Sequence, residues 1–145
     1  MMMPAQIFAV ANFAALCGWL LLVVLPQKRW VSHLVSGVAI PAAFAALYTI
    51  IIALHFAGSD GGFSSLPDVA RLFNNPWLLL AGWIHYLAFD LLVGSWEVRD
   101  ARERGIGHVF VVPCLILTFL FGPAGWLLYL GVRSGVRSSA LAPER

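Results

Sequence analysis

An aspartate and a histidine lie within one apolar segment of this sequence. Asp90 and His85 fall inside residues 77–96, about the 20 residues that a helix needs to cross a bilayer. An ionisable side chain at that depth is costly, so it marks a functional site by default. A carboxylic acid donates a proton to a substrate and an imidazole accepts one, which is general acid–base chemistry. Asp90 and His85 are therefore the candidate catalytic residues.

The free energy of membrane insertion limits where Asp90 lies. An Asp at the centre of a membrane helix costs about 2.5–3.5 kcal/mol, and the Leu, Ile, Val and Phe residues of the segment return about 3–5 kcal/mol. The segment inserts, with Asp90 facing other helices and protonated or hydrogen-bonded. Pro41 and Pro113 are expected at the same level, where each frees a backbone carbonyl group for Asp90. Two interpretations stay open: a structural clasp on a broken helix, or a proton donor, ligand contact or relay.

Aromatic residues indicate what Asp90 would act on. Trp83, Tyr86, Asp90 and Glu97 share one stripe of the predicted helix, whereas His85 lies roughly 140° away from Asp90. His85 and Asp90 can border one cavity without sharing a face. The six Trp, ten Phe and three Tyr either pack and anchor the helices or line a cleft for a long polyene or isoprenoid, with room left by the small residues 122–125. The candidate substrate-binding residues are Trp19, Trp83, Tyr86, Phe89, Phe121 and Trp126.

The composition places these residues in an all-α integral membrane protein. Of the 145 residues, 61% are hydrophobic and 11% charged, against roughly 45–50% and 25% in soluble domains. The net charge of +2 gives no electrostatic footprint for nucleic acid. The only lysine, Lys28, lies between two spans, which excludes a buried retinal Schiff base. No spacing is diagnostic of haem or a metal, so the sequence leaves the cofactor unknown.

Four apolar spans are expected to form a single transmembrane domain over residues 1–145. The spans cover about residues 5–25, 34–56, 77–96 and 109–132, and the fourth is expected to be broken or kinked by Pro113 and by Gly122-Pro123. They predict a four-helix bundle with a polar tail over residues 133–145. A short interfacial helix is expected over residues 67–74, between the second and third spans, with Ser64 or Ser65 as its cap. Small residues at positions 11, 15 and 18 let the first helix approach its neighbours closely.

Prolines and charged residues define the breaks and ends of these spans. The third helix is expected to continue to Arg104, because Arg99 with Glu103 and Asp100 with Arg104 are spaced as i,i+4 ion pairs, and Gly105 then ends it. The first and third connections hold five basic residues and the opposite side holds four, which favours both termini outside. The residues with predicted structural or interfacial roles are Pro41, Pro113, Pro123, Arg99, Asp100, Arg104 and His108.

Three stretches of the sequence resemble a known family. They are Trp83-Ile84-His85-Tyr86-Leu87-Ala88-Phe89-Asp90-Leu91, the connection with Arg99-Asp100-Ala101, Arg104-Gly105-Ile106 and His108, and Pro113-Cys114-Leu115 followed by Thr118-Phe119-Leu120-Phe121-Gly122-Pro123-Ala124-Gly125. They resemble the neoxanthin synthase-like family, which is named for an abscisic-acid-deficient plant mutant. The resemblance implies a small membrane protein linked in plants to converting violaxanthin into neoxanthin, a carotenoid epoxide-to-allene isomerisation. Because no plastid transit peptide is visible, the chain resembles the bacterial branch, and the bacterial cytoplasmic membrane is its expected location.

Hypotheses from different functional classes follow. The first is a membrane-embedded isomerase of carotenoids or isoprenoids, in which Asp90 is the acid toward an epoxide oxygen and His85 is the base or relay. The second is a non-catalytic subunit that binds pigment or lipid, or scaffolds an enzyme. The third is a small transporter. Four spans with one acidic residue are few for a transporter, so this hypothesis requires that the chain forms a homo-oligomer, for example through Gly131 and Gly135. In each case the expected partners are the lipid bilayer and an apolar ligand.

Overall fold

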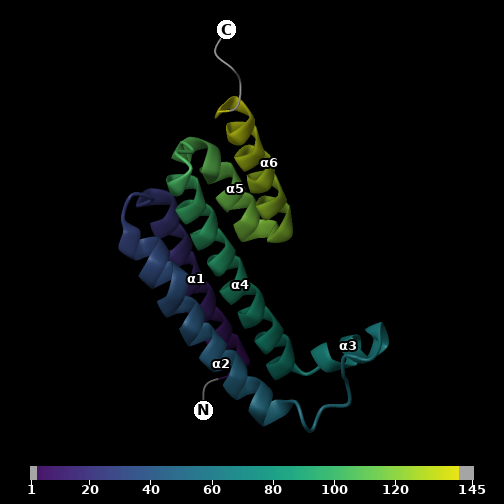
Figure 1. The fold of residues 1–145 in the computed structure, drawn as a ribbon. Coiled ribbons are helices and arrows are strands. Elements are labelled where there is room, and N and C mark those ends of the chain that lie inside the picture. The colour runs from purple at the N-terminus through teal and green to yellow at the C-terminus, as the bar shows by residue number, and fades with distance from the viewer. Residues whose placement is uncertain (1–2, 141–145) are drawn as a thin grey trace.

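Three long helices form the body of the protein, whose structure is a computed structural model that describes residues 3–140. They are α1 (Pro4–Val24), the π-helix η1 (Val31–Ala39) continuing into α2 (Ile40–His55), and α4 (Pro76–Glu103). All three lie side by side along one direction, with α4 beside both of the others (Figure 1). Each is long and apolar enough to cross a membrane, at the positions expected for the first three spans.

The outward faces of these helices are apolar, as a bilayer requires. Phe13 is 70% exposed and Leu54 is 73% exposed, and many other large hydrophobic side chains lie on the same outer surface. Water-soluble monomers rarely expose apolar patches of this extent. The all-helical architecture with three long apolar helices is therefore that of a membrane protein.

Small residues bring α1 close to its neighbours, as the sequence predicts. Ala11, Ala15 and Gly18 are buried. A Cβ added at Gly18 would lie 3.0 Å from a Leu91 methyl group and 3.1 Å from Ile40 Cδ1. A larger side chain there would require Leu91 and Ile40 to shift.

The sequence predicts a break in the second span at Pro41, and in the structure the helix widens in the residues directly before this proline. Residues Val31–Ala39 form a π-helix, and Pro41, which has no N–H group to donate, follows in the first turn of α2. Arg99 of α4 donates from Nη1 to the Ser32 carbonyl oxygen at 2.5 Å. The expected Arg99–Glu103 ion pair is thus replaced by a contact that ties α4 to η1.

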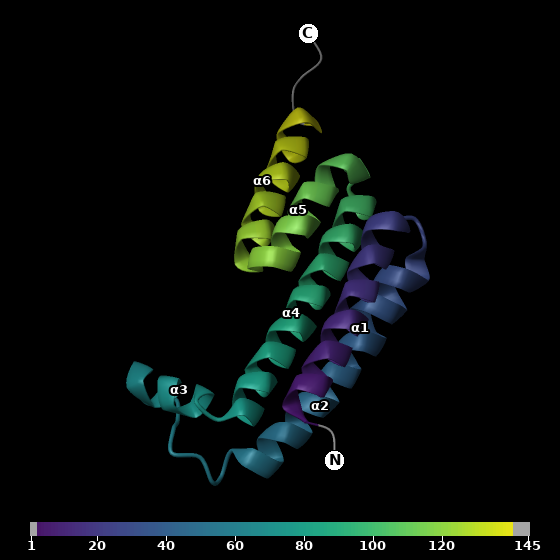
Figure 2. The same cartoon turned by 180° about the vertical axis from the view of Figure 1, so that it is seen from behind.

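The short helix expected between the second and third spans is confirmed as α3 (Leu66–Phe73), one residue earlier than expected. Ser65 is its cap and accepts a hydrogen bond from the Asp68 N–H group at 3.3 Å. Hydrogen bonds from Ser65 and Arg71 hold the pKa of Asp68 below its usual value. The helix extends sideways from the end of α4 that is remote from the chain's C-terminus (Figures 1 and 2). It therefore adds a wall beside the start of α4 without becoming part of the long-helix bundle.

The fourth span, expected over residues 109–132 with a break or kink at Pro113 and at Gly122-Pro123, breaks at Gly122 and does not continue in one direction. The segment forms α5 (His108–Phe121) and α6 (Pro123–Ala140), which run antiparallel as a helical hairpin (Figures 1 and 2). Gly122 makes the turn with φ 47°, a left-handed conformation that favours glycine. The 14 residues of α5 extend only about 21 Å, which is short of the ~30 Å apolar core of a bilayer. The hairpin therefore covers only the C-terminal half of α4, and the predicted four-helix bundle is replaced by three long helices with a shorter hairpin.

Residues 133–140 of the expected polar tail belong to α6, and residues 141–145 lie outside the described part.

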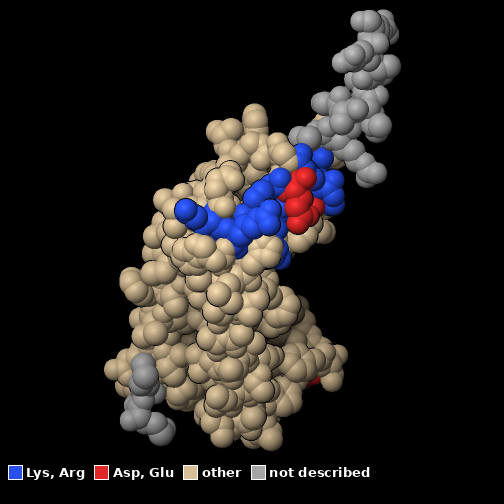
Figure 3. All heavy atoms as spheres, turned by 60° about the vertical axis from the view of Figure 1, so that its left-hand side comes forward, with Lys and Arg blue, Asp and Glu red and all other residues tan. Residues whose placement is uncertain are grey.

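The hairpin also changes the expected topology. Because α6 returns toward the end where α5 begins, its last residue lies at the opposite end of the molecule from Pro4 (Figure 1). Lys and Arg side chains gather as a band over the α6 end (Figure 3). Arg104 and Arg133 lie there together, since both pair with Asp100, and Arg71 of α3 lies at the other end. From the positive-inside rule we then expect the basic end to face the cytoplasm, with the two ends of the described chain on opposite sides.

Cysteine labelling of intact cells tests this topology. In a background with Cys17 and Cys114 replaced by alanine, we expect Met3→Cys to react with a membrane-impermeant maleimide added outside. Lys28→Cys and Ser134→Cys should react only after the membrane is opened. A continuous fourth span would instead place Ser134→Cys on the same side as Met3→Cys, so their common reactivity would contradict the hairpin.

Candidate functional site

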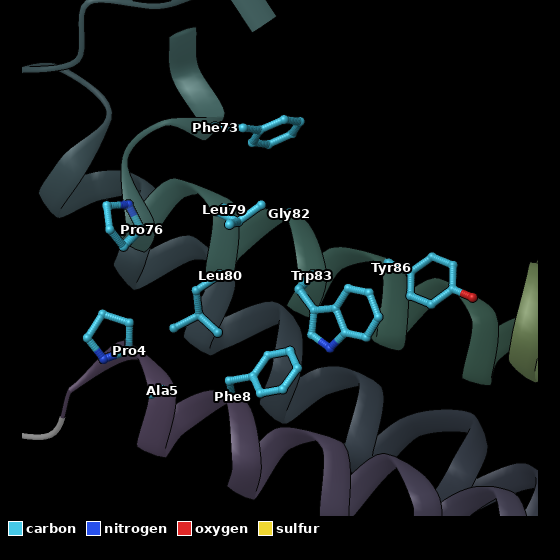
Figure 4. Close-up of a pocket in the computed structure, with 10 residues that line it drawn as sticks. All are labelled: Pro4, Ala5, Phe8, Phe73, Pro76, Leu79, Leu80, Gly82, Trp83 and Tyr86. Atoms are coloured by element: carbon cyan, nitrogen blue, oxygen red, sulfur yellow. The ribbon is translucent and has the colours of Figure 1, made fainter. Parts of the chain in front are cut away.

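An open apolar groove lies on the part of α4 that the hairpin leaves uncovered. Its volume is about 600 Å³, within the range of roughly 300–1,000 Å³ typical of ligand pockets. The lining residues come from α1, α3 and α4: Pro4, Ala5, Phe8, Phe73, Pro76, Leu79, Leu80, Gly82, Trp83 and Tyr86 (Figure 4). The groove thus exists because α5 turns back at Gly122 and α3 stands aside from α4.

Aromatic rings form the wall of the groove nearest to the hairpin. The Trp83 ring lies 5.6 Å from the Phe8 ring and 5.3 Å from the Tyr86 ring, measured between centroids. Trp83 Nε1 donates to Asn12 Oδ1 at 3.1 Å, which fixes the orientation of the indole against α1. The groove therefore presents flat, ordered apolar surfaces, as an extended polyene or isoprenoid requires.

Tyr86 connects the groove to the hairpin. Its ring lines the groove, and its hydroxyl group points away from the other lining residues (Figure 4). The hydroxyl donates to the Phe119 carbonyl oxygen at 3.3 Å, near the end of α5. The Asp90 carboxyl group lies one turn further along α4, close enough to interact electrostatically with this hydroxyl group. A polar group of a ligand at this end of the groove would meet Tyr86 first and Asp90 next.

Asp90 packs against the turn of the hairpin. A Cβ added at Gly122 would lie 2.9 Å from Asp90 Oδ1 and 3.3 Å from Oδ2, so only glycine leaves room for the carboxyl group. Asp90 Oδ2 is buried and accepts no hydrogen bond from the residues that the structure describes. A buried acceptor without a partner is costly, which marks this atom as one that a ligand or water would satisfy.

The expected level of Asp90 relative to Pro113 is corrected by this contact. The connection between α4 and α5 is short, and the two helices run antiparallel. Residues at equal distances from this connection therefore lie at the same level. Asp90 lies about 20 Å before the end of α4, and α5 is about as long, which brings Asp90 level with Gly122. Pro113 lies nearer the start of α5, where it is exposed. Pro123 begins α6, directly after the turn.

His85 lies on a different side of α4 from Asp90, as the helical spacing predicts. Its ring is 5.6 Å from the Tyr48 ring of α2 and 4.5 Å from the Phe89 ring. His85 does not line the groove. Within the described residues the structure therefore brings Asp90 together with Tyr86, and His85 together with Tyr48 and Phe89.

The six aromatic candidates for substrate contact are divided between three places. Trp83 and Tyr86 line the groove. Trp19 is buried in the core, where its ring packs edge-on against Phe119 at 5.7 Å. The remaining three are exposed on the outer surface, with exposed fractions of 56%, 63% and 40% for Phe89, Phe121 and Trp126. Only the first pair therefore belongs to the same site as Asp90.

Glu97 and Thr118 form a polar contact that the sequence analysis missed. Both side chains are fully buried, and Thr118 Oγ1 donates to Glu97 Oε1 at 3.0 Å. Glu97 Oε2 has no hydrogen-bond partner among residues 3–140. Glu97 lies on the Asp90 stripe, two turns toward the end of α4, and Thr118 lies one turn before Gly122. The C-terminal part of the stripe predicted from the sequence, with Asp90 and Glu97, is therefore the face of α4 that the hairpin covers, and Glu97 belongs among the candidates.

The predicted interfacial residues lie at the basic end of the bundle. Asp100 pairs with Arg104 at 2.8 Å, as expected from their spacing. His108 Nε2 is 2.9 Å from the Val23 carbonyl oxygen and links the start of α5 to the end of α1. Arg102, which was not predicted, donates to the Pro26 carbonyl oxygen and to Ser32 Oγ. These contacts hold α1, η1, α4 and α5 in register and so fix where Gly122 meets Asp90.

Comparison with known proteins decides the family. The family model described as ABA DEFICIENT 4-like matches residues 6–129. The chain belongs to the ABA DEFICIENT 4-like family. The matched residues include most of the groove, Asp90 and the hairpin turn, so the whole candidate site except Pro4 and Ala5 belongs to the ABA DEFICIENT 4-like region. No curated protein and no solved structure matches the chain.

Proposed function

We propose that this chain is an integral membrane protein that binds the end of a carotenoid or related isoprenoid in the groove and isomerises it. The observation that carries the proposal is the path from the apolar groove, through the Tyr86 hydroxyl group, to the Asp90 carboxyl group. An apolar ligand lies along Leu79 and Trp83, and its oxygen-bearing end reaches Tyr86 and Asp90. The family and the sequence motifs support carotenoid-related chemistry. We further propose the bacterial cytoplasmic membrane as its location.

The proposed reaction opens an epoxide and forms an allene. The Asp90 carboxylic acid protonates the epoxide oxygen, one C–O bond breaks, and a hydroxyl group and a carbocation result. Loss of a proton from the adjacent alkene carbon gives the allene, and the Asp90 carboxylate recovers that proton directly or through Tyr86. Substrate and product are isomers, so the reaction needs no oxidant or reductant. The apolar groove keeps water from the cation.

The role of the base differs in this proposal from the sequence hypothesis. His85 contacts Tyr48 and Phe89 on another side of α4. Tyr86, in contrast, borders both the groove and Asp90. We therefore assign the relay to Tyr86 and keep Asp90 as the acid.

A non-catalytic pigment- or lipid-binding subunit is the second candidate function. The packing of Asp90 on Gly122 favours it, because the same contact would serve as a clasp that holds the hairpin to α4. In that case the groove still binds an isoprenoid, but the Asp90 carboxyl group transfers no proton. The two candidates therefore differ in whether the wild-type chain changes the pigment composition and in whether substitution of Asp90 abolishes that change.

Pigment chromatography tests the proposed function. We expect membranes of a host that makes carotenoid epoxides to contain a new isomer when the chain is expressed. Gly82→Leu should remove that product, because a Cβ at Gly82 already lies 3.0 Å from the Phe73 ring and the remaining side chain fills the groove. Gly131→Leu is the matched control, since nothing lies within 4 Å of its added Cβ. Equal pigment profiles with and without the wild-type chain would contradict catalysis on those carotenoids.

A further inference from the structure

A cluster of charged side chains fixes the end of α4 to α6, at the opposite end of α4 from the groove. Asp100 accepts hydrogen bonds from Arg104 Nε at 2.8 and 2.9 Å and from the Tyr129 hydroxyl group at 2.7 Å, and Arg133 Nε lies 3.1 Å from its Oδ2. Asp100 is 8% exposed and Tyr129 is fully buried. The buried carboxylate therefore holds two arginines from different helices in fixed positions.

The two arginines keep donors for a second anion. An arginine has five N–H donors in a planar fork, and every hydrogen bond of Arg104 and Arg133 to the described residues goes through Nε. Arg133 is further held over the Trp96 ring, with its Cζ atom 5.6 Å from the centroid. Paired, pre-oriented guanidinium groups recognise phosphate, because two N–H groups can bind two oxygens at once.

A small pocket lies between these arginines. Its volume is about 180 Å³, several times the roughly 30 Å³ of one water molecule in the liquid. Arg104, Leu130, Arg133 and Ser134 line it. With Asp100 included, the cluster carries a net charge of +1 (two arginines and one aspartate). A phosphodiester carries one negative charge, so one such group neutralises the cluster.

The surroundings of the pocket favour a lipid as the source of that phosphodiester. Leu127, Leu130 and Ser134 lie on one face of α6 at spacings of three and four residues, so apolar surface continues from the pocket toward the turn. Leu127 is 62% exposed and the neighbouring Trp126 is 40% exposed. Two of the residues that line the pocket, Arg104 and Arg133, are basic and meet at Asp100 near the end of α4. The charged headgroup of a phospholipid would thus contact the arginines, and its apolar acyl chains would contact the exposed apolar surface of α6.

We propose that the pocket between Arg104 and Arg133 binds the phosphodiester headgroup of an anionic phospholipid, whose acyl chains lie along the exposed apolar face of α6. The site is separate from the groove and does not depend on the function proposed there. At the level of the lipid headgroups, the bound phospholipid holds α6 of the hairpin against α4. The hairpin extends along only half of the bundle. The acyl chains of a bound lipid would therefore also cover its exposed apolar surface.

Titration of the purified full-length protein with phosphatidylglycerol tests the site, with binding followed by native mass spectrometry in detergent. We expect one tightly bound lipid per chain, and phosphatidylcholine should not replace it. Arg133→Gln and Arg104→Gln should each weaken binding about tenfold, as expected for loss of one charge-assisted contact. Arg133→Lys should weaken it as well, because lysine keeps the charge but not the planar fork. Lys28→Gln removes the same charge from an exposed position at the same end and should change binding less than about twofold.

Three results would overturn the proposal. Equal losses in Arg133→Gln and Lys28→Gln would show a diffuse charge effect without a site. Displacement of the lipid by millimolar inorganic phosphate would assign the pocket to a free anion. Unchanged binding in Arg133→Lys, with its thermal unfolding midpoint equal to that of the wild type, would remove the guanidinium fork from recognition. This conservative variant keeps the test valid if Arg133→Gln fails to fold.

Discussion

Asp90→Asn is expected to abolish product formation while the protein still inserts and folds. Asparagine has nearly the same shape as aspartate, so it fits against Gly122, but it cannot deliver a proton to an epoxide oxygen. Loss of a general acid lowers a rate by about 10²–10⁴-fold. Membrane insertion should not be weakened, because replacing the carboxyl group also removes much of the free-energy cost of placing it in the apolar core. The measurement is the new isomer per unit of protein, by pigment chromatography of membranes at matched abundance.

Two further variants show whether the effect belongs to the site. Thr49→Val is the matched control, since Thr49 is exposed on α2 and its hydroxyl group bonds only to the Ala45 carbonyl oxygen. It should leave product formation unchanged. His85→Asn distinguishes the two proposed relays: retained product supports Tyr86, and lost product supports the base role first assigned to His85. Full activity of Asp90→Asn would eliminate the acid role and leave Asp90 as a clasp.

Gly125→Ala is expected to have the largest effect on stability. A Cβ at Gly125 would lie 2.1 Å from the Thr118 backbone nitrogen and 2.5 Å from its Cα, so backbone rather than a mobile side chain is in the way. Accommodating even one methyl group requires α6 to move away from α5. We expect the free energy of unfolding to fall by about 3 kcal/mol, at the upper end of overpacking effects. Thermal unfolding of the detergent-solubilised protein, followed by circular dichroism, measures it.

Gly131→Ala provides the comparison within the same helix. Nothing lies within 4 Å of the added Cβ, and alanine is favoured over glycine by about 1 kcal/mol in a helix interior. The two alanine variants should therefore shift the unfolding midpoint in opposite directions. If both stabilise the protein, α5 and α6 do not pack closely at Thr118, and the hairpin arrangement would be contradicted. Because the hairpin turn lies on Asp90, Gly125→Ala should also reduce product formation.

Most of the long elements could be predicted because each has a strong local signal. The first and third spans are uninterrupted apolar runs, and Arg104 with Gly105 marks the end of α4. There the Ile106 N–H group bonds to the Ala101 carbonyl oxygen at 2.8 Å, as a glycine-terminated helix does. Ser65 followed by Pro67 similarly marked α3. These signals depend on neighbouring residues alone, so sequence is enough to identify them.

The hairpin could not be predicted from hydropathy, because an apolar run measures length and not direction. Residues 109–132 are apolar throughout whether the chain crosses the bilayer or turns back within it. The informative signal was Gly122-Pro123, followed by Gly125, which permits a left-handed turn and then close helix contact. The sequence analysis interprets the same residues as a break or kink in one span and as space for a ligand, whereas Gly125 packs on Thr118.

The candidate site was predicted in part for a related reason. The stripe of Trp83, Tyr86, Asp90 and Glu97 follows from helical periodicity, which is a property of α4 alone. The partner of Asp90 depends on the antiparallel register of α5, which the contacts at the basic end set. Sequence spacing within one helix does not contain that register, so Pro113 was expected where Gly122 lies.

Pigment retained by the purified protein is the most direct test of the groove and of Asp90 together. We would isolate wild type, Asp90→Asn and Gly82→Leu from carotenoid-producing membranes and record bound pigment per chain by absorption and chromatography. The account predicts that Asp90→Asn retains unconverted pigment, because its groove is intact, whereas Gly82→Leu retains none. Pigment retained equally by Gly82→Leu, or absent from every variant and from the wild type, would contradict an isoprenoid site in this groove.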